Sequence, residues 1–490
     1  MPYPDHEALS SANNLLISEE LSYDITNLQT EFDCLLNSLT DEQRMVFDEI
    51  ITAVDGNTGG VFFVYGYGGT GKTFLWKTLS ASIRSKGEIV LNVASSGIAS
   101  LLLTGGRTAH SRFLIPINLN EDSLCHIKPG GDVAHLLKET KLIIWDEAPM
   151  VHKHAFEALD RTMKDIFSSG TSINEEIPFG GKVIVFGGDF RQILPVIPNG
   201  SRQEIVNASL SSSYLWRKCK LLKLTKNMRL TVGSQTSDTE QTKNFAHWLL
   251  DLGEGKVGDT NDGDACIEIP DDLLIKDSSD PIKIVQEIND RLLSMFPGEE
   301  REYLSSDSIL QTEHINDPLQ ERLYSPDVLN GLKISGLPNH RLVLKVGVPV
   351  MLLRNIDQRS GLCNGTRLQI LSLHKRVIEA KIISGGNIGT RAFIPRISLI
   401  PSDRRIPFKF QRRQFPLSVC FAMTINKSQG QSLSRIGLFL KDPVFTHGQL
   451  YVALSRVKSR DGVKVLILDE DGRVTNKTTN VVYKEVFRDL

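Results

Sequence analysis

A glycine-rich turn between an apolar strand and a helix-forming segment is the feature of this sequence that most constrains its fold. The stretch "VFFVYGYGGTGKTFLW" fits the spacing G-x-x-x-x-G-K-[ST]. In this arrangement backbone N–H groups wrap a phosphate at a helix N-terminus, Lys72 spans the β- and γ-phosphates, and Thr73 holds Mg²⁺. A glycine turn with a chance lysine is the alternative, but strand, loop and helix are all in place. The predicted cradle residues are Gly66, Gly68, Gly69, Thr70, Gly71, Lys72 and Thr73.

Length and composition indicate a globular protein with more than one domain. The chain has 490 residues, whereas a single core rarely exceeds roughly 250–300. A formal net charge of -2 gives no overall attraction to nucleic acid or membrane, so any polyanion site must be a local basic surface. The six cysteines lack C-x-x-C spacing, and no apolar run or N-terminal targeting pattern suggests a membrane or an organelle. We therefore expect a soluble intracellular protein with free thiols.

Alternating strand and helix patterns predict an α/β fold. Buried-strand patterns at "GVFFVYG", "EIVLNVAS", "KLIIWDE" and "KVIVFGGD" are separated by helix-length segments, which indicates a parallel sheet covered on both faces. Short β patterns around the turns "CNGT" and "SGGN" come later, and a second α/β rhythm follows them. The predicted parts are a polar tail or an extra helix (1–35), a first α/β domain (36–215), a second one (216–340 and 415–490) and an inserted β module (341–414).

Polar residues follow two further strands of the predicted sheet. In "KLIIWDEAPM", Asp146 is placed to hold a magnesium-bound water, and Glu147 to orient or deprotonate an attacking water. The alternative is that this pair caps the next helix. "VIVFGGDFRQILPV" repeats the pattern, with Arg191 and Gln192 placed to sense a γ-phosphate or, alternatively, lying in a solvated loop.

Two arginines lie far from the cradle in sequence. Arg229 in "LTKNMRL" and Arg456 in "YVALSRV" each end a patterned segment. Phosphoryl transfer gains most from a cation placed at the developing charge, so these side chains are candidates to reach the nucleotide. The alternative for each is an ordinary surface arginine. If both reach one nucleotide, it lies between two lobes.

The ordered motifs together resemble the Pif (petite integration frequency) type of superfamily-one DNA helicase, and especially the branch carried by plant Helitron transposons. The resemblance covers about residues 38–490 and depends on the order of "GYGGTGKT", "IIWDEAPM", "GGDFRQILPV", "LTKNMRL", "TINKSQGQ" and "LYVALSRV". It implies two RecA-like P-loop domains with ATP between them, a small SH3-like barrel inserted in the second, and ATP-driven 5′-to-3′ movement along single-stranded DNA. It also implies a role in DNA repair, recombination, or telomere or transposon maintenance.

The same resemblance assigns roles to particular residues. It makes Gln43 the adenine-reading glutamine, Gln192 the γ-phosphate sensor, and Arg229 and Arg456 the two arginine fingers. Lys72 and Glu147 complete the predicted catalytic set, with Thr73 and Asp146 as the Mg²⁺ ligands. The expected cofactors are ATP and Mg²⁺. The expected partners are single-stranded DNA and 5′-tailed duplex DNA, bound by a monomer in the nucleus or alternatively the mitochondrion.

Three family segments that touch DNA are present. They are "ASSGIAS", "GGRTAHSRF" and "TINKSQGQ", and they supply hydroxyls, a ring and a cation suited to phosphates. The predicted DNA-binding residues are Ser96, Thr108, His110, Lys427 and Ser428. Phe113 is a further candidate to stack on a base, although core filling explains it equally well. A basic stretch that includes Arg412 and Arg413 is either a strand-facing track or a solvated connector.

The sequence departs from the family pattern near residues 280–287. Relatives have additional helical sequence and an apolar strand there, whereas this chain has only the short "PIKIV". A missing central strand would leave backbone groups unpaired, so we expect a weakened second domain. The alternative function is therefore a helicase-derived nucleic-acid-binding ATPase that no longer unwinds. A metabolite kinase is disfavoured, because it would not need Arg229, Arg456 or the "KSQGQ" segment.

Overall fold

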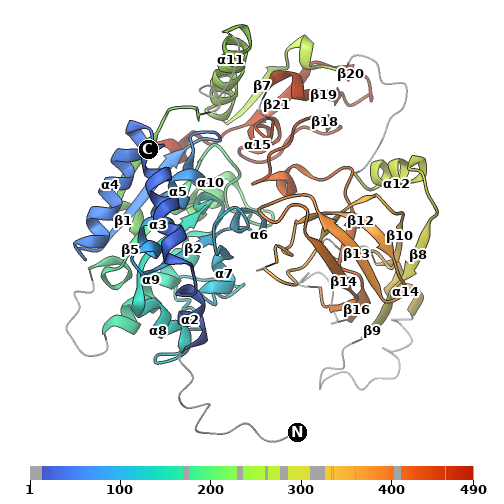
Figure 1. Cartoon of the computed structure of the whole chain (residues 1–490). Coiled ribbons are helices and arrows are strands. Elements are labelled where there is room, and N and C mark those ends of the chain that lie inside the picture. The colour runs from blue at the N-terminus through green and yellow to red at the C-terminus, as the bar shows by residue number, and fades with distance from the viewer. Residues whose placement is uncertain are drawn as a thin grey trace, which may run out of the picture. The chain divides into compact units, whose positions relative to one another are not determined.

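The apolar strand patterns of the sequence form one six-stranded sheet in which every strand is parallel to its neighbours, and its order is β3-β2-β4-β5-β1-β6. Figure 1 labels β1, β2 and β5 of this sheet. The strands are β1 (Gly60–Gly66), β2 (Ile89–Ala94), β3 (Arg107–Thr108), β4 (Thr140–Asp146), β5 (Val183–Gly188) and β6 (Cys219–Leu224). Each βα connection places the loop that follows a strand at the same edge of the sheet, where ligands bind in such folds. The predicted α/β fold is confirmed.

The computed structural model describes residues 14–168, 176–228, 236–259, 263–275, 285–309, 326–332, 334, 336–358, 360–401, 410–457, 459–488 and 490. The chain divides into two compact units. The first comprises 1–278 and 428–490, and the second comprises 279–427. None of the described helices has the length and apolar character of a transmembrane segment.

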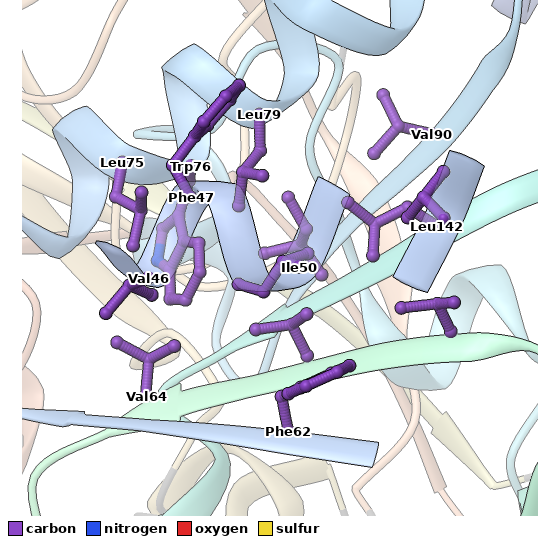
Figure 2. Packing of buried hydrophobic residues seen from close by; sticks show 14 of the residues in the cluster. Val46, Phe47, Ile50, Phe62, Val64, Leu75, Trp76, Leu79, Val90 and Leu142 are labelled. Atoms are coloured by element: carbon purple, nitrogen blue, oxygen red, sulfur yellow. The ribbon is translucent and has the colours of Figure 1, made fainter. Parts of the chain in front are cut away.

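Helices cover both faces of the sheet in the first unit. Those from its N-terminal part are α2 (Leu15–Glu20), α3 (Ile25–Asn37), α4 (Asp41–Asp55), α5 (Lys72–Ser85), α6 (Gly97–Ser100), α7 (Ala109–Arg112), α8 (Asp132–Glu139), α9 (Lys153–Ser168) and α10 (Arg202–Ala208). Figure 2 shows how α4 and α5 pack on one face, where Phe47, Ile50 and Leu79 meet Phe62 and Val64 of β1. Because neighbouring strand residues face opposite sides, Phe63 points to the other face, beside Phe190 and Trp216.

The segment before the first domain belongs to the fold. Residues 1–13 lie outside the described part, and from Asn14 onward the segment is helical, which favours the alternative of an extra helix over that of a tail. Helix α3 packs along α5, and its Phe32 ring lies 5.9 Å from that of Phe47. Helix α2 contains Glu20, which is buried in an ion pair with Arg112. The residues in this segment form two helices that bury Glu20 and Leu35 against the domain, whereas Leu15 and Ile25 are exposed.

The first domain also extends beyond its predicted end at residue 215. Strand β6 pairs in parallel with β1 over Val61↔Cys219 to Gly66↔Leu224. The two lysines of "CKLLKL" interrupt the apolar pattern by which a buried strand is recognised in the sequence. An edge strand such as β6 tolerates these exposed charges. Its hydrogen bonds to β1 place residues 219–224 in the first sheet.

The C-terminal part of the first unit is a second, smaller group of strands and helices. It contains α11 (Thr236–Gly253), β7 (Asp264–Glu268), β18 (Ile436–Leu440), α15 (Gln449–Leu454), β19 (Val463–Leu468), β20 (Val474–Thr475) and β21 (Lys477–Val481). Strands β18 and β19 are parallel, and β20 adds to them in the antiparallel direction, whereas β21 pairs with β7. Residues 276–284 lie outside the described part, so the missing central strand stays a prediction.

The second unit is built mainly of antiparallel strands. Its elements are α12 (Val285–Met295), β8 (Arg301–Leu304), β9 (Ser306–Ile309), α14 (Pro326–Gly331), β10 (Arg341–Leu344), β11 (Pro349–Leu352), β12 (Arg367–Leu373), β13 (Val377–Ile382), β14 (Arg391–Pro395), β15 (Ile397–Leu399), β16 (Phe410–Gln414) and β17 (Leu417–Val419). Residues 279–340 were expected in the second α/β domain. Instead β8 pairs with β10 and β9 with β16, so backbone hydrogen bonds tie this segment to the β module.

Within this unit, the position of Arg412 contradicts the hypothesis that this residue lies on a DNA-facing surface. Its side chain is fully buried and pairs with the buried carboxylate of Asp307 at 2.7 Å. The same guanidinium donates to the carbonyls of Leu332, Pro338 and Leu329. Arg413, the next residue, is exposed on the opposite side of the strand, and residues 402–409 lie outside the described part. Arg412 is therefore a structural residue.

Candidate active site

The glycine-rich loop connects β1 directly to α5, whose first residue is Lys72. Gly71 has a φ of +84°, and a Cβ there would collide with the side-chain amide of Gln43, so glycine is required on both counts. Lys72 Nζ donates to the carbonyl of Gly66, and the Thr70 hydroxyl donates to the carbonyl of Tyr67 at 3.0 Å. The loop is therefore closed on itself at the N-terminus of a helix, which is the usual arrangement of a phosphate site.

Gln43 lies beneath this loop, as the sequence predicts for a residue of the nucleotide site. It is 2% exposed, and its Nε2 donates to the Thr70 carbonyl at 3.1 Å. Its Oε1 accepts from the Thr40 backbone N–H at 3.1 Å in the capping box that begins α4. Each amide atom keeps one further hydrogen-bonding position. The recognition of adenine by this side chain stays a proposal.

Asp146 and Glu147 lie at the carboxyl end of β4, close to the cradle. Burial raises the pKa of Asp146, and the Lys72 ammonium opposes that shift. Burial and the Asp146 carboxylate raise the pKa of Glu147 to about 7, against the attraction of Lys72 and Arg456. Glu147 has a φ of +54°, which turns its side chain sharply out of the strand direction. Both carboxylates therefore have raised pKa values in a shared buried environment, and the pKa of Glu147 lies near neutral pH.

The donor set beside Lys72 fits Mg²⁺. The Oδ1 atom of Asp146 is buried and has no hydrogen-bond partner, which is costly unless a cation occupies the position next to it. Thr73, the second residue of α5, is exposed. Among the described residues no cluster of three acidic, histidine or cysteine side chains could hold a metal ion. Mg²⁺ commonly binds through only one or two protein oxygens together with water and nucleotide phosphates, so Asp146 and Thr73 are sufficient.

The segment after β5 is tied to the C-terminal part of the same unit. Asp189 is fully buried and accepts from the Arg191 guanidinium at 3.2 Å and from the Tyr451 hydroxyl at 2.8 Å. Arg191 also pairs with Glu254 at the end of α11. Gln192, the predicted γ-phosphate sensor, accepts from the side-chain amide of Gln429 at 3.3 Å. Contacts from two distant parts of the chain therefore fix the position of this loop.

Arg456 approaches the site from the end of α15. Its Nε donates to the Val452 carbonyl at 2.8 Å, and its Nη1 donates to the Gln431 carbonyl at 3.2 Å. Its charge lowers the pKa of Glu147, which places it within electrostatic range of the cradle. The other predicted arginine finger, Arg229, lies outside the described residues. The backbone N–H of Met228, the residue before it, donates to Gly69 of the cradle at 2.9 Å.

Two residues of this site were missed by the sequence analysis. One is Tyr451, whose hydroxyl bonds to Asp189. The other is the fully buried His447: its Nδ1 accepts from the Tyr483 backbone N–H at 2.8 Å, so Nε2 carries the proton and donates to the Phe190 carbonyl at 2.7 Å. Burial lowers the pKa of His447 to about 4, which keeps the ring neutral. Both residues lie in "HGQLYVALSRV", but nothing in that pattern indicates which side chains cross to β5.

Of the predicted DNA-binding residues, three lie around one short segment of the first unit. Ser96 caps α6 by accepting from the Ala99 backbone N–H at 3.2 Å. Thr108 precedes α7 without forming a side-chain cap, and the partly exposed His110 lies on α7, where burial lowers its pKa. All three side chains are at least partly accessible.

The remaining DNA candidates are distributed differently. Ser428 is 7% exposed, in a segment whose Gly430 lies against Ala99 of α6. Lys427 is exposed and belongs to the second unit. Phe113 is fully buried, with its ring 6.0 Å from that of Trp145, so it fills the core and does not stack on a base.

Comparisons with known proteins agree with this geometry. Residues 38–263 match the model of the PIF1-like helicases, and residues 327–373 match that of the 2B domain of DNA helicase Pif1. The chain belongs to the PIF1-like helicase family. The match to the 2B domain falls within the second compact unit, and the helicase match covers the whole six-stranded sheet.

Individual relatives have low sequence identity to this chain, but their alignments cover most of it. The chain is 28% identical over 470 residues to the ATP-dependent DNA helicase PIF1 of Danio rerio, covering 91% of this chain and 64% of that protein. It therefore spans less than two thirds of the length of that relative. A crystal structure of Bacteroides Pif1 bound to ssDNA is 25% identical with a TM-score of 0.59, covering 87% of this chain and 92% of that one. A structure of two coordinating Pif1 helicases at forked dsDNA has the same identity and TM-score, covering 87% and 91%.

Proposed function

We propose that this protein is an ATP-dependent DNA helicase that couples ATP hydrolysis to 5′-to-3′ movement on single-stranded DNA and to duplex unwinding. The observation that carries the proposal is the convergence of Lys72, Asp146, Glu147 and Arg456 at the cradle. The first three residues lie at the edge of the six-stranded sheet, at the start of α5 and the end of β4, whereas Arg456 follows α15, more than half the chain away in sequence. A metabolite kinase can bind and transfer the phosphate with residues around the sheet alone. A motor needs, in addition, a residue from a second part of the protein that reaches the nucleotide.

Each side chain has a role that follows from its position. Lys72 would hold the β- and γ-phosphates, and the N–H groups of the loop would bind the oxygens around them. Glu147 would take the proton of the attacking water, since its pKa of about 7 suits a base at neutral pH. Arg456 would stabilise the charge that develops on the transferred phosphoryl group. Thr73 and Asp146 would hold Mg²⁺, which, when bound, neutralises phosphate charge.

Gln192 and its neighbours provide a route by which nucleotide state affects the second part of the unit. Gln192 bonds to Gln429, and Asp189 bonds to Tyr451, so a shift of the loop after β5 moves two contacts to the C-terminal segment. Gln429 immediately follows Ser428, one of the predicted DNA-binding residues. The proposed coupling between ATP and DNA therefore passes through a path of direct hydrogen bonds.

Unwinding assays with defined tails test this function. We expect ATP turnover to rise strongly with single-stranded DNA, and a 5′-tailed duplex to be unwound while a 3′-tailed duplex is not. The Lys72→Ala variant should show neither activity. Turnover that DNA stimulates without any unwinding would instead favour the alternative of a DNA-binding ATPase that has lost motor function. Turnover that DNA leaves unchanged would contradict both.

The raised pKa of Glu147 gives the expected pH dependence of ATP turnover. The base must be charged to accept a proton, so kcat/KM for ATP should fall about tenfold per pH unit once the pH drops below about 7. The measurement is kcat/KM at saturating single-stranded DNA and constant free Mg²⁺, because protonation of ATP changes its metal binding. A profile that stays flat down to about pH 5.5 would contradict the assignment of Glu147 as the base.

The finer assignments belong to the same proposal. The motif order supports the plant Helitron-like branch within the family, with roles in repair, recombination, or telomere or transposon maintenance. The proposed partners are single-stranded and 5′-tailed duplex DNA, and the proposed compartment is the nucleus, with the mitochondrion as alternative. A monomer is the simplest active form, and sedimentation with and without forked DNA tests it against a pair of helicases.

A further inference from the structure

Helix α2 lies outside the part of the chain that the family model matches, which begins at residue 38. It nevertheless supplies two adjacent carboxylates to the interior of the first domain. Glu20 is 7% exposed and pairs with Arg112 and, at 3.5 Å, with Arg84. Glu19 pairs with Arg107 at 3.1 Å, where both side chains are about one quarter exposed. These pairs connect the N-terminal helix to the segment 107–112.

The arginines that α2 binds surround two predicted DNA-binding residues. Arg107 directly precedes Thr108, and Arg112 is the last residue of α7, which also contains His110. Arg107 and Arg112 thus hold the two ends of a six-residue segment, and each is paired with a carboxylate of the same helix. Thr108 and His110 lie between these two attachments and are partly exposed.

Arg84 extends the connection to the nucleotide cradle. It lies near the end of α5, the helix that begins with Lys72, and its Nη1 donates to the Thr104 carbonyl at 3.0 Å. The Tyr23 ring, just after α2, lies 4.0 Å from the Arg84 guanidinium. A Cβ at Gly105 would collide with the Tyr23 hydroxyl, so Tyr23 packs directly against the backbone of the loop that precedes Arg107.

We propose that helix α2 positions the segment Arg107–Arg112 for binding single-stranded DNA, with Glu20 and Glu19 as the positioning residues. The inference rests on the proposed helicase function, because it is that function which makes the segment a DNA-binding surface. Burying one carboxylate between two guanidinium groups is costly unless the groups are held in fixed geometry. The ion pairs therefore fix α7 relative to α5, and the exposed polar groups of α7 with it.

The test compares three single variants of the full chain: Glu20→Gln, Glu19→Gln and, as the matched control, Glu31→Gln. Glu31 lies on the neighbouring helix α3 and pairs with Lys77 of α5 at 2.5 Å, away from the segment 107–112. Each variant removes one negative charge. Electrostatics alone would therefore leave the affinity for DNA unchanged or raise it, and any loss of affinity must come from lost positioning.

The readouts are the dissociation constants for a fluorescent oligothymidylate and for a fluorescent ATP analogue, measured on the same preparations at fixed salt. We expect DNA binding to weaken about tenfold in Glu20→Gln and about threefold in Glu19→Gln, which is typical of indirect coupling. Binding of the ATP analogue should be unchanged in both, and Glu31→Gln should match the wild type for both ligands.

Two results would overturn the inference while leaving the proposed function intact. In the first, the wild type binds DNA, and the Glu20→Gln and Glu19→Gln variants bind it at least as tightly as Glu31→Gln does. The other is a parallel loss of DNA and ATP-analogue binding, which indicates general unfolding. If Glu20→Gln does not fold, the result for Glu19→Gln decides, because the Glu19–Arg107 pair is more exposed than the Glu20 pair. A wild type that binds no single-stranded DNA would overturn the helicase proposal together with this inference.

Discussion

Replacing Glu147 with glutamine is expected to reduce DNA-stimulated ATP turnover by about 10²–10⁴-fold, the range that a positioned general base contributes. Glutamine keeps the size of the side chain but has no basic oxygen of comparable strength. Binding of ATP should survive, because the cradle contacts of Lys72 and the loop backbone are unchanged. The measurement is kcat at saturating ATP and DNA, together with the dissociation constant for ATP under non-hydrolysing conditions.

The stability of this variant separates a chemical effect from misfolding. The folded-state pKa of Glu147, about 7, lies above its ordinary value of 4.5, so the charged form destabilises the fold, and that penalty is fully present only above about pH 7. Removing the charge should therefore leave the free energy of unfolding at pH 8 unchanged or higher. Lys72→Ala serves as the contrasting variant, since it should lose ATP binding as well. Retention of more than a tenth of the wild-type rate in Glu147→Gln would contradict the role of this residue.

Replacing Arg412 with methionine is expected to destabilise the second unit by about 3–5 kcal/mol, because the buried Asp307 carboxylate loses its cationic partner and keeps the hydrogen bond from the Ser305 hydroxyl. All five N–H groups of this guanidinium are used, three of them on backbone carbonyls that would also lose their donors. All four tryptophans belong to the first unit, so their fluorescence does not report on this loss. Urea-dependent hydrogen exchange of peptides from β9, β15 and β16 measures it directly.

Two further variants complete this test. Arg413→Met removes an equal charge from the exposed neighbour and should change the free energy of unfolding by less than about 0.5 kcal/mol, as is usual at the surface. The double variant Arg412→Met/Asp307→Leu should recover much of the lost stability, since an apolar pair can replace a buried ion pair. Equal destabilisation by Arg412→Met and Arg413→Met would contradict the structural role assigned to Arg412. Arg413 remains the residue with which to test a DNA-facing track.

Much of the first domain could be predicted from local patterns. The strands that end at Gly66, Asp146 and Gly188 are continuous apolar runs, and buried parallel strands have this signature. The spacing of its glycines and lysine identified the glycine-rich loop, and Thr40 with Gln43 forms the capping box of α4 from residues three positions apart. These features succeed because neighbouring residues alone determine them.

The errors arose where a residue's environment depends on distant parts of the chain. Arg412 and Glu20 look like a surface cation and a tail carboxylate in sequence, but they are buried against residues 105 and 92 positions away, respectively. Base stacking and core filling explained Phe113 equally well in sequence, and only its packing beside Trp145 favours the core. Strand β6 and the segment that contains β8 and β9 were misassigned for the same reason, because strand pairing across a large sequence distance decides their domain.

Local residue patterns were sufficient to identify the nucleotide cradle, the carboxylate pair at the end of β4 and the order of motifs that places the chain in its family. These depend on residue types at fixed short spacings, which phosphate and metal chemistry require. The contacts of Tyr451 and Gln429 with the loop after β5, and the effect of Arg456 on Glu147, could be found only in the folded structure. It alone showed that α2 binds the arginines around Thr108 and His110. Such contacts join segments far apart in the chain, and their energies depend on burial and on the partners that folding brings together.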